Sequence, residues 1–283
     1  MEENMFKATE ILDNTEGGVM LHMNRLGYIM IAVAESVIIY GRNKSDNKLT
    51  AELWIYDCRR KKWRLFILPD LLTYTCKNSS ICAHGSKIYI FGVPAISDSQ
   101  DIAATLFSFD VRSFMLVDLF KELINTGNEP PKMKQSDIMY DRASIYILGT
   151  NMDDVGVMYK FHLEKCQLSM ITHAGYLPHP DDRGHCTLYK NKIYYFRQIS
   201  LDVDQFSQVR VFDLSTRIWE LRQQETDTTK YPYDRLDPAL IFNDNYGYLA
   251  GGFLFSPSYE ERAEYLWLTR LIYPPQQEMK YGE

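Results

Sequence analysis

Short apolar runs, each ended by a glycine or a polar turn, recur along the whole chain. The clearest example spans Ser36 to Phe66 and reads S-V-I-I-Y-G-R-N, a polar loop, and then A-E-L-W-I-Y-D-C-R-R-K-K-W-R-L-F. Val37 to Tyr40 is apolar throughout, as expected of a strand that is buried on both faces. We predict that this strand ends at Gly41 and is followed by a loop. A second strand is predicted to end at Asp57, and a third to begin at Trp63 after an exposed basic turn.

The same order of runs returns four more times, and each return predicts further strands. In the first two repeats they are Gly27 to Val33, Ser79 to His84, Lys87 to Gly92 and Leu106 to Asp110. In the later repeats they are 136–140, 144–149, 158–162, 183–189, 192–197, 209–219, 238–242, 247–252 and 264–269. The turn positions 41, 92, 149, 197 (an arginine) and 251 give a repeat of about 50 residues. That period is typical of a propeller with four strands in each blade.

A second marker repeats within the blades. Asp57 is followed six residues later by Trp63, and Asp213 is followed at the same interval by Trp219. At the corresponding places in the second and third repeats stand Leu116 and Leu168. We predict that these leucines replace the tryptophan, because a core tolerates exchange of one apolar residue for another.

The two ends of the chain bear on how the ring closes. Counting back from Arg25 by the spacing of the fourth repeat reaches Phe6 to Leu12, so we expect this segment to be the fourth strand of the last blade. The alternative is that Gln276 to Tyr281 supplies that strand and residues 1–24 form a loose arm. We therefore predict an all-β propeller of five four-stranded blades at residues 25–273, with an N-terminal arm carrying the closing strand at 1–24 and a short polar tail at 274–283. A sixth blade would require a degenerate unit hidden in a long connection.

Several residue sets recur at this period, namely Ile88 to Gly92, Gly247 to Gly252, the two Asp–Trp pairs and the triplet Arg183-Gly184-His185. By these residues the chain at 25–272 resembles kelch-repeat proteins. Its last repeat, with a long loop from Phe253 to Arg262 before Tyr265-Leu266-Trp267, is similar to the final repeat of the kelch domain-containing substrate receptors of cullin-RING ubiquitin ligases. The glycine pair typical of these repeats is kept only in the fifth, and the first has Gly41-Arg42 instead. The resemblance implies a protein-interaction module that could serve as a ubiquitin-ligase substrate receptor. The sequence shows no BTB, F-box or elongin-binding helix.

Composition narrows the classes of function. The net charge is −6 over 283 residues, which argues against non-specific nucleic-acid binding, because phosphate binding needs concentrated Lys and Arg. No apolar run is long enough to span a membrane, and the start lacks the basic region and apolar core of a signal peptide. The five cysteines form no CxxC pair, so we expect neither a disulfide framework nor a zinc site. A reduced compartment, the cytoplasm or the nucleus, is expected.

The candidate binding residues lie at the strand ends that face the mouth of the central channel in kelch proteins. They follow the second strand or precede the first strand of a blade, and they are Arg42, Asn43, Asn151, Arg197, Gln198, Phe253, Arg25, Arg183 and Arg235. Several arginines on one surface can bind carboxylates or phosphates bidentately. The resemblance implies that the partner is a protein or peptide with an acidic or C-terminal carboxylate motif. The alternative for any single arginine is a solvated loop residue, or one that pairs with a neighbouring Asp.

Catalytic motifs are not found. The chain has no G-x-S-x-G, no P-loop and no G-x-G-x-x-G. His185 is expected to make a structural hydrogen bond between blades, and the adjacent carboxylates at 153–154 and 181–182 are typical of turns. We predict a non-enzymatic interaction module that uses no metal and no cofactor. A fixed scaffold subunit of a larger complex and an enzyme built on a propeller stay open as alternatives.

Overall fold

The structure, a computed structural model, is all-β, as predicted, in the part of the chain that it describes. The described residues are 25–45, 48–68, 78–93, 104–121, 123, 133–153, 155–175, 178, 184–197, 208–223, 235–236, 239–242, 246–250, 253–254 and 269–272. The chain divides into two compact units, residues 1–170 and 171–283, which are described separately below. Within the described ranges, no helix is long and apolar enough to cross a membrane.

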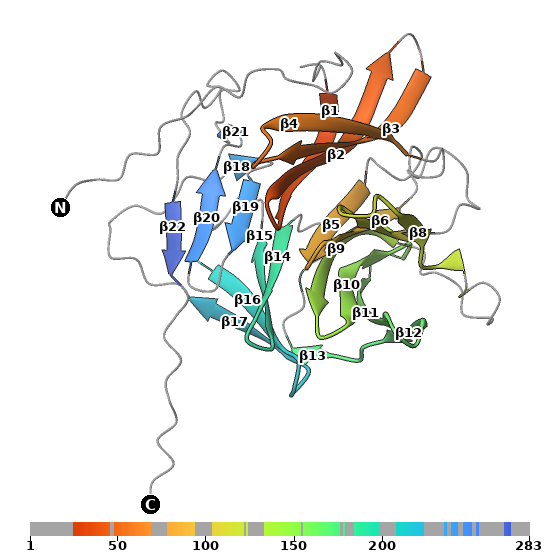
Figure 1. Cartoon of the computed structure of the whole chain (residues 1–283). Coiled ribbons are helices and arrows are strands. Elements are labelled where there is room, and N and C mark those ends of the chain that lie inside the picture. The colour runs from red at the N-terminus through yellow and green to blue at the C-terminus, as the bar shows by residue number, and fades with distance from the viewer. Residues whose placement is uncertain are drawn as a thin grey trace, which may run out of the picture. The chain divides into compact units, whose positions relative to one another are not determined.

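The first unit holds three antiparallel sheets, each made of four strands that follow one another in the chain (Figure 1). The first sheet comprises β1 (Arg25–Val33), β2 (Ser36–Ser45), β3 (Lys48–Asp57) and β4 (Lys62–Ile67). The second comprises β5 (Asn78–His84), β6 (Lys87–Val93), β7 (Thr105–Asp110) and β8 (Leu116–Asp118). The third comprises β9 (Met133–Asp141), β10 (Ser144–Asn151), β11 (Gly156–His162) and β12 (Gln167–Met170). This meander is the predicted blade, found three times in succession.

The second unit continues the pattern with a fourth meander and part of a fifth. One sheet has the order β13-β17-β16-β15-β14. Its strands are β13 (Ala174–Gly175), β14 (Gly184–Tyr189), β15 (Lys192–Arg197), β16 (Gln208–Asp213) and β17 (Ile218–Gln223). The fifth repeat contains the sheet β19-β20-β22 and the pair β18–β21. Their bounds are β18 (Arg235–Leu236), β19 (Ala239–Phe242), β20 (Tyr246–Ala250), β21 (Phe253–Leu254) and β22 (Thr269–Ile272).

Tight turns join the first two strands of each of the four complete meanders. Each turn has two residues, and its first residue has positive φ: Ala34, Gly85, Arg142 and Lys190. Such turns match the right-handed twist of the flanking strands, so they fix the register of the hairpin. Three of the four positions are not glycine, which is why a search for glycine turns alone does not find them.

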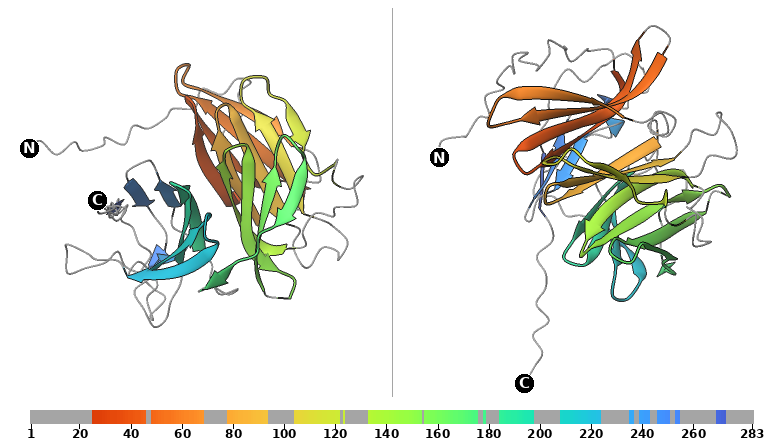
Figure 2. Two further views of the ribbon diagram at one scale, coloured as in Figure 1. Left: turned by 90° about the horizontal axis from the view of Figure 1, so that it is seen from below. Right: turned by 45° about the vertical axis from the view of Figure 1, so that its right-hand side comes forward.

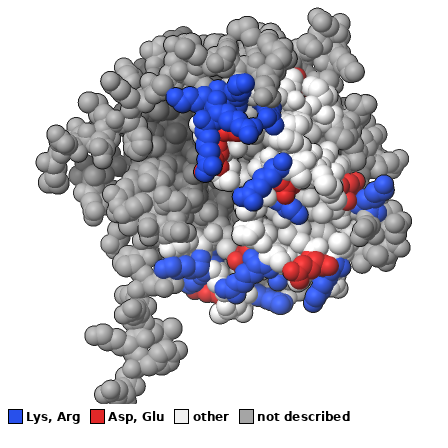
Figure 3. Space-filling view, viewed as in Figure 1, with Lys and Arg blue, Asp and Glu red and all other residues white. Residues whose placement is uncertain are grey.

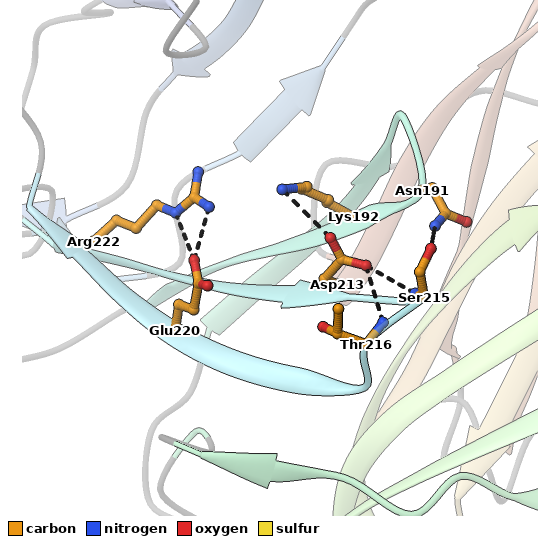
Figure 4. Close-up of polar contacts among 7 residues, drawn as sticks. All are labelled: Asn191, Lys192, Asp213, Ser215, Thr216, Glu220 and Arg222. Carbon is orange, nitrogen blue, oxygen red and sulfur yellow. Dashed lines mark hydrogen bonds and ion pairs between the residues drawn. The ribbon is translucent and has the colours of Figure 1, made fainter. Parts of the chain in front are cut away.

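The turn between the third and fourth strands also repeats, and an aspartate caps it in three sheets. Asp57, Asp110 and Asp213 each accept two backbone N–H hydrogen bonds from the residues that follow, at 2.8–3.3 Å. Figure 4 shows this arrangement in the fourth sheet, where Ser215 and Thr216 donate to Asp213. In the third sheet His162 stands at this position. The aspartate of the repeat is therefore a structural cap.

The cores of the first unit lie between its sheets, which Figure 2 shows side by side. One cluster joins the first and second sheets and includes Val33, Leu53 and Ile88. Another joins the second and third sheets and includes Phe91, Ile147 and Phe161. The predicted exchange of Trp for Leu is confirmed by register, since Leu116 and Leu168 pair with Phe109 and Phe161 just as Trp63 and Trp219 pair with Tyr56 and Phe212.

Four features differ from the sequence prediction or lie outside the described residues. The prediction that a strand ends at Gly41 is wrong, because β2 continues to Ser45 and pairs with β3 along its whole length. The last strand of the fifth repeat, predicted at 264–269, is described only from Thr269 onward as β22. Strand β13 was not predicted, and it adds a parallel strand to the edge of β17. Both segments proposed to close the ring, Phe6 to Leu12 and Gln276 to Tyr281, lie outside the described residues.

Candidate functional site

The predicted binding residues with a described backbone lie at one end of their sheets, where second strands end and first strands begin. In the first sheet Arg25 pairs with Asn43, and Leu26 pairs with Arg42. In the fourth sheet Arg197 lies opposite Gly184, and in the fifth repeat Phe253 lies opposite Leu236, next to Arg235. Arg183 and Gln198 lie outside the described residues. We call this end of a sheet its loop end.

Arg42 belongs to a strand and not to the loop that the sequence predicted. Gly41 and Arg42 pair with Glu52 and Ala51 of β3, and the ladder runs on to the pair Ser45–Lys48. The polar residues that look like a loop therefore form an extended hairpin, because antiparallel pairing satisfies backbone groups whatever side chains the strand carries.

A buried carboxylate that sequence reasoning missed lies at the same loop end. Glu52 has only 4% of its surface exposed, and it accepts a hydrogen bond of 2.8 Å from Nε1 of Trp54. The two residues share one face of β3, since side chains two apart along a strand point the same way. In backbone register Glu52 lies opposite Gly41, one position from the pair that contains Arg42. A buried carboxyl group is thus fixed close to the strand position of Arg42.

The loop end of the third sheet is held by Asn151. Its Oδ1 accepts hydrogen bonds from the backbone N–H groups of Asp153 at 3.0 Å and Val155 at 2.9 Å. Its own N–H donates to the carbonyl oxygen of Val155 at 2.9 Å. The Asn151 side chain therefore closes an Asx-type loop, which is the ordinary structural role of such a residue.

This loop presents two apolar side chains to solvent, which sequence reasoning also missed. Met152 is 46% exposed and Val155 is 53% exposed. The signal in the sequence is an apolar residue on each side of Asp153-Asp154 within a polar turn. A loop stiffened by its own hydrogen bonds can offer apolar groups to a partner with little loss of conformational freedom. The arrangement is suited to binding.

The opposite end of each sheet, which we call its turn end, holds the capped turns and most of the described ion pairs. In the fourth sheet Lys192 pairs with Asp213 at 3.5 Å at this end, whereas the pair of Arg222 and Glu220, at 2.8 Å, lies farther along β17 (Figure 4). Burial raises the pKa of Asp213, but the N–H groups of Ser215 and Thr216 and the charge of Lys192 outweigh it, so the pKa lies below its usual range. The N–H of Arg112 chiefly lowers the pKa of Asp110 in the same way.

The other shifted pKa values are caused mainly by burial. Burial raises the pKa of the Cys82 thiol, and it raises the pKa of Tyr89 to about 12, with Tyr140 and Cys82 nearby adding to the effect. Burial lowers the pKa of His173. Among the described residues, no group of three or more His, Cys, Asp or Glu side chains is placed to hold a metal ion.

A family model described as the KLHDC2/KLHL20/DRC7 Kelch-repeats domain matches residues 27–252. No curated protein matches the chain. Among solved structures, "Structure of YjhT" is similar with a TM-score of 0.53 and 10% identity, covering 81% of this chain and 78% of that one. The β-propeller domain of the Trilobed protease from Pyrococcus furiosus has a TM-score of 0.44 and 11% identity, covering 88% and 69%. The family match and the similarity to YjhT confirm the predicted kelch-type β-propeller.

Proposed function

The chain belongs to the kelch-repeat family, and from this premise we propose that it binds a partner protein at the loop end of its sheets. Kelch repeats generally form non-enzymatic interaction domains. The proposed site in the first unit comprises Arg42 and Asn43 of the first sheet and the loop of the third sheet held by Asn151. In the second unit the arginines at 183, 197 and 235, with Gln198 and Phe253, occupy the corresponding sequence positions.

The observation that carries the proposal is the exposed pair Met152 and Val155 on a loop fixed by Asn151. Methionine is enriched in protein interfaces, and the cost of ordering a loop on binding is small when the loop is already ordered. The inner strands β1, β5 and β9 lie next to one another, so the three loop ends of the first unit face the same side of that unit. A partner that contacts the third sheet can therefore reach toward the first.

The chemistry of the partner follows from the arginines. A guanidinium binds a carboxylate through two parallel N–H bonds, so a partner segment with acidic side chains or a free C-terminal carboxylate suits Arg42. Together with the family, this supports a role as substrate receptor of a ubiquitin ligase, located in the cytoplasm or the nucleus.

Site-specific photo-crosslinking in cells tests the proposal. A photoreactive residue in place of Met152 should capture a defined protein, and Arg42→Ala in the same chain should reduce the yield severalfold. The same photoreactive residue in place of Ile218, which is also 46% exposed but lies in the fourth sheet, is the matched control. Equal capture at both positions would remove the support for the loop end. If depletion of this chain does not raise the level of the captured protein, the receptor role is wrong while the binding site stands.

A further inference from the structure

A second surface lies in the first unit at the turn end of the second sheet, where apolar side chains are exposed among cations. The turn between β7 and β8 presents Phe114 with 38% and Met115 with 62% of their surfaces exposed. The ring of Phe114 stacks on Phe66 of the neighbouring β4, with centroids 5.1 Å apart. The guanidinium of Arg64, also on β4, lies 5.2 Å from the centre of the Phe114 ring. Phe114 is thus held in place by the next blade while part of its surface stays open.

The turn itself does not require an aromatic residue. Phe114 has φ of 58°, and the corresponding residues of the other three turns are Lys61, Cys166 and Arg217, with φ between 47° and 59°. This left-handed conformation costs a residue with a side chain roughly 1–2 kcal/mol. Met115, the next residue, has most of its surface exposed to solvent.

Basic side chains frame this apolar pair. Lys62 lies on the same face of β4 as Arg64, since alternate residues of a strand share a face. Arg112 lies in the turn itself, two residues before Phe114, and both Lys62 and Arg112 are exposed. Figure 3 shows basic side chains gathered in clusters on one face of the molecule, beside acidic ones. A local excess of positive charge on a chain of net charge −6 marks a surface for a partner of opposite sign.

The carboxylates near this surface are already engaged. Asp110 accepts hydrogen bonds from the N–H groups of Arg112 and Ser113. Asp57 accepts two backbone N–H bonds and lies 3.8 Å from Nε of Arg60, and Glu35 pairs with Arg59. These contacts hold the acids in their turns, while Lys62 and Arg112 stay exposed.

We propose that Phe114 and Met115, with Lys62 and Arg112, form a docking surface for a protein segment that carries an apolar side chain flanked by Asp or Glu. The apolar side chain packs on Met115 and the open edge of Phe114, and the flanking carboxylates pair with the two cations. Interfaces favour this combination of aromatic, Met and Arg residues. The surface is at the turn end of its sheet, opposite the loop end, so it does not rest on the function proposed above.

Methyl NMR tests the docking surface directly. The probe is a short acidic peptide with one central leucine, titrated into the full chain labelled at methionine methyl groups, with Met115 assigned from Met115→Ile. The Met115 signal should shift and saturate, while the signals of Met30 and Met170, exposed by 53% and 62%, should not move. Lys62→Glu with Arg112→Glu should weaken binding about tenfold or more. The matched control, Lys190→Glu with Arg217→Glu in the fourth sheet, should leave binding unchanged.

Each other outcome overturns the proposal. A Met115 signal that does not move up to about 1 mM peptide shows that the surface does not recognise acidic apolar segments. Equal weakening by the control pair shows that the attraction is only general charge. A single-stranded oligonucleotide that shifts Met115 at lower concentration than the peptide would assign the surface to nucleic acid instead. Arg42→Ala serves to separate the two sites, because it should weaken binding at the loop end severalfold and leave the Met115 titration intact.

Discussion

His84 of the second sheet and Tyr140 of the third stack face to face, with ring centroids 4.0 Å apart and planes 12° from parallel. The hydroxyl of Tyr140 accepts a hydrogen bond from the N–H of Ala143, so the stack also anchors the turn that follows β9. We expect His84→Ala to lower the free energy of unfolding by about 1 kcal/mol, the value of a stacked aromatic pair. Urea unfolding measures it, with His84→Phe as the control that keeps the ring. Equal losses in both variants would mean that the stack itself contributes nothing.

The third sheet lacks the aspartate cap found in the first, second and fourth sheets. A single substitution at His162 should introduce it. His162 occupies the place of Asp57, Asp110 and Asp213, and its buried Nδ1 has no hydrogen-bond partner among the described residues. His162→Asp should stabilise the chain by about 0.5–1.5 kcal/mol, because the carboxylate would accept the free N–H groups of the turn. Thermal unfolding of this variant beside His162→Ala measures the effect. If both variants melt at the same temperature, the cap is not what the turn needs.

Substitution by glycine should have opposite effects on stability at different left-handed turn positions. Lys61→Gly and Arg217→Gly should each stabilise by about 0.5–1 kcal/mol, because glycine adopts their positive φ without cost. Phe114→Gly should destabilise instead, because it removes the stack on Phe66. Chemical denaturation of the three variants gives the three signs. A stabilised Phe114→Gly protein would contradict the packing role of that ring.

Stability should fall in mild acid for a specific reason. The folded-state pKa values of Asp110 and Asp213 lie below their usual values. Their contribution is therefore fully present above the unfolded pKa of about 3.9 and is lost as pH falls through the lower folded value. The unfolding free energy should stay level above about pH 5 and drop below about pH 4. Asp110→Asn and Asp213→Asn together should flatten that drop, and an unchanged slope would assign the acid sensitivity to other groups.

A substitution at the loop end of the first sheet should reduce partner binding without reducing the stability of the fold. Arg42 lies past Gly41 on β2, between Leu26 of β1 and Ala51 of β3. Arg42→Ala should therefore reduce capture of the partner severalfold and change the melting temperature by less than about 1 °C. Arg59→Ala, at the turn end of the same sheet, is the control that should affect neither. A lower melting temperature in Arg42→Ala would make the residue structural.

The regular strands could be predicted because their signals are local. The apolar run at 192–197 matches β15, and the leucines at 116 and 168 take the tryptophan position in register. The stop at Gly41 was predicted wrongly, because a glycine is compatible with an extended strand when both neighbouring strands continue to pair. Strand β13 has no pattern to detect, since Ala174 and Gly175 bind only through their backbones.

The sequence prediction of the binding site considered mainly charged residues, and it therefore missed the exposed apolar ones. The arginines could be placed at one end of the sheets from repeat spacing alone, and whether they bind stays a prediction. Met152 and Val155 were overlooked because an isolated apolar residue in a polar turn resembles noise, and only the hydrogen bonds of Asn151 show that the loop is fixed. The exposed Phe114 could not be predicted, because its exposure depends on how far the neighbouring blade covers it.

Strand β13 has a consequence for the order in which the second unit folds. Most strands pair with a neighbour in sequence, often across a turn of only two residues, so their meanders can form quickly from local contacts. Ala174 and Gly175 pair instead with Ile218 and Trp219, on the far side of the intervening β14, β15 and β16. Closing that long loop is unfavourable until the meander offers a finished edge. The pairing of β13 is therefore a late step, and a substitution at Gly175, whose Cβ would collide with the carbonyl oxygen of Trp219, should speed unfolding more than it slows folding.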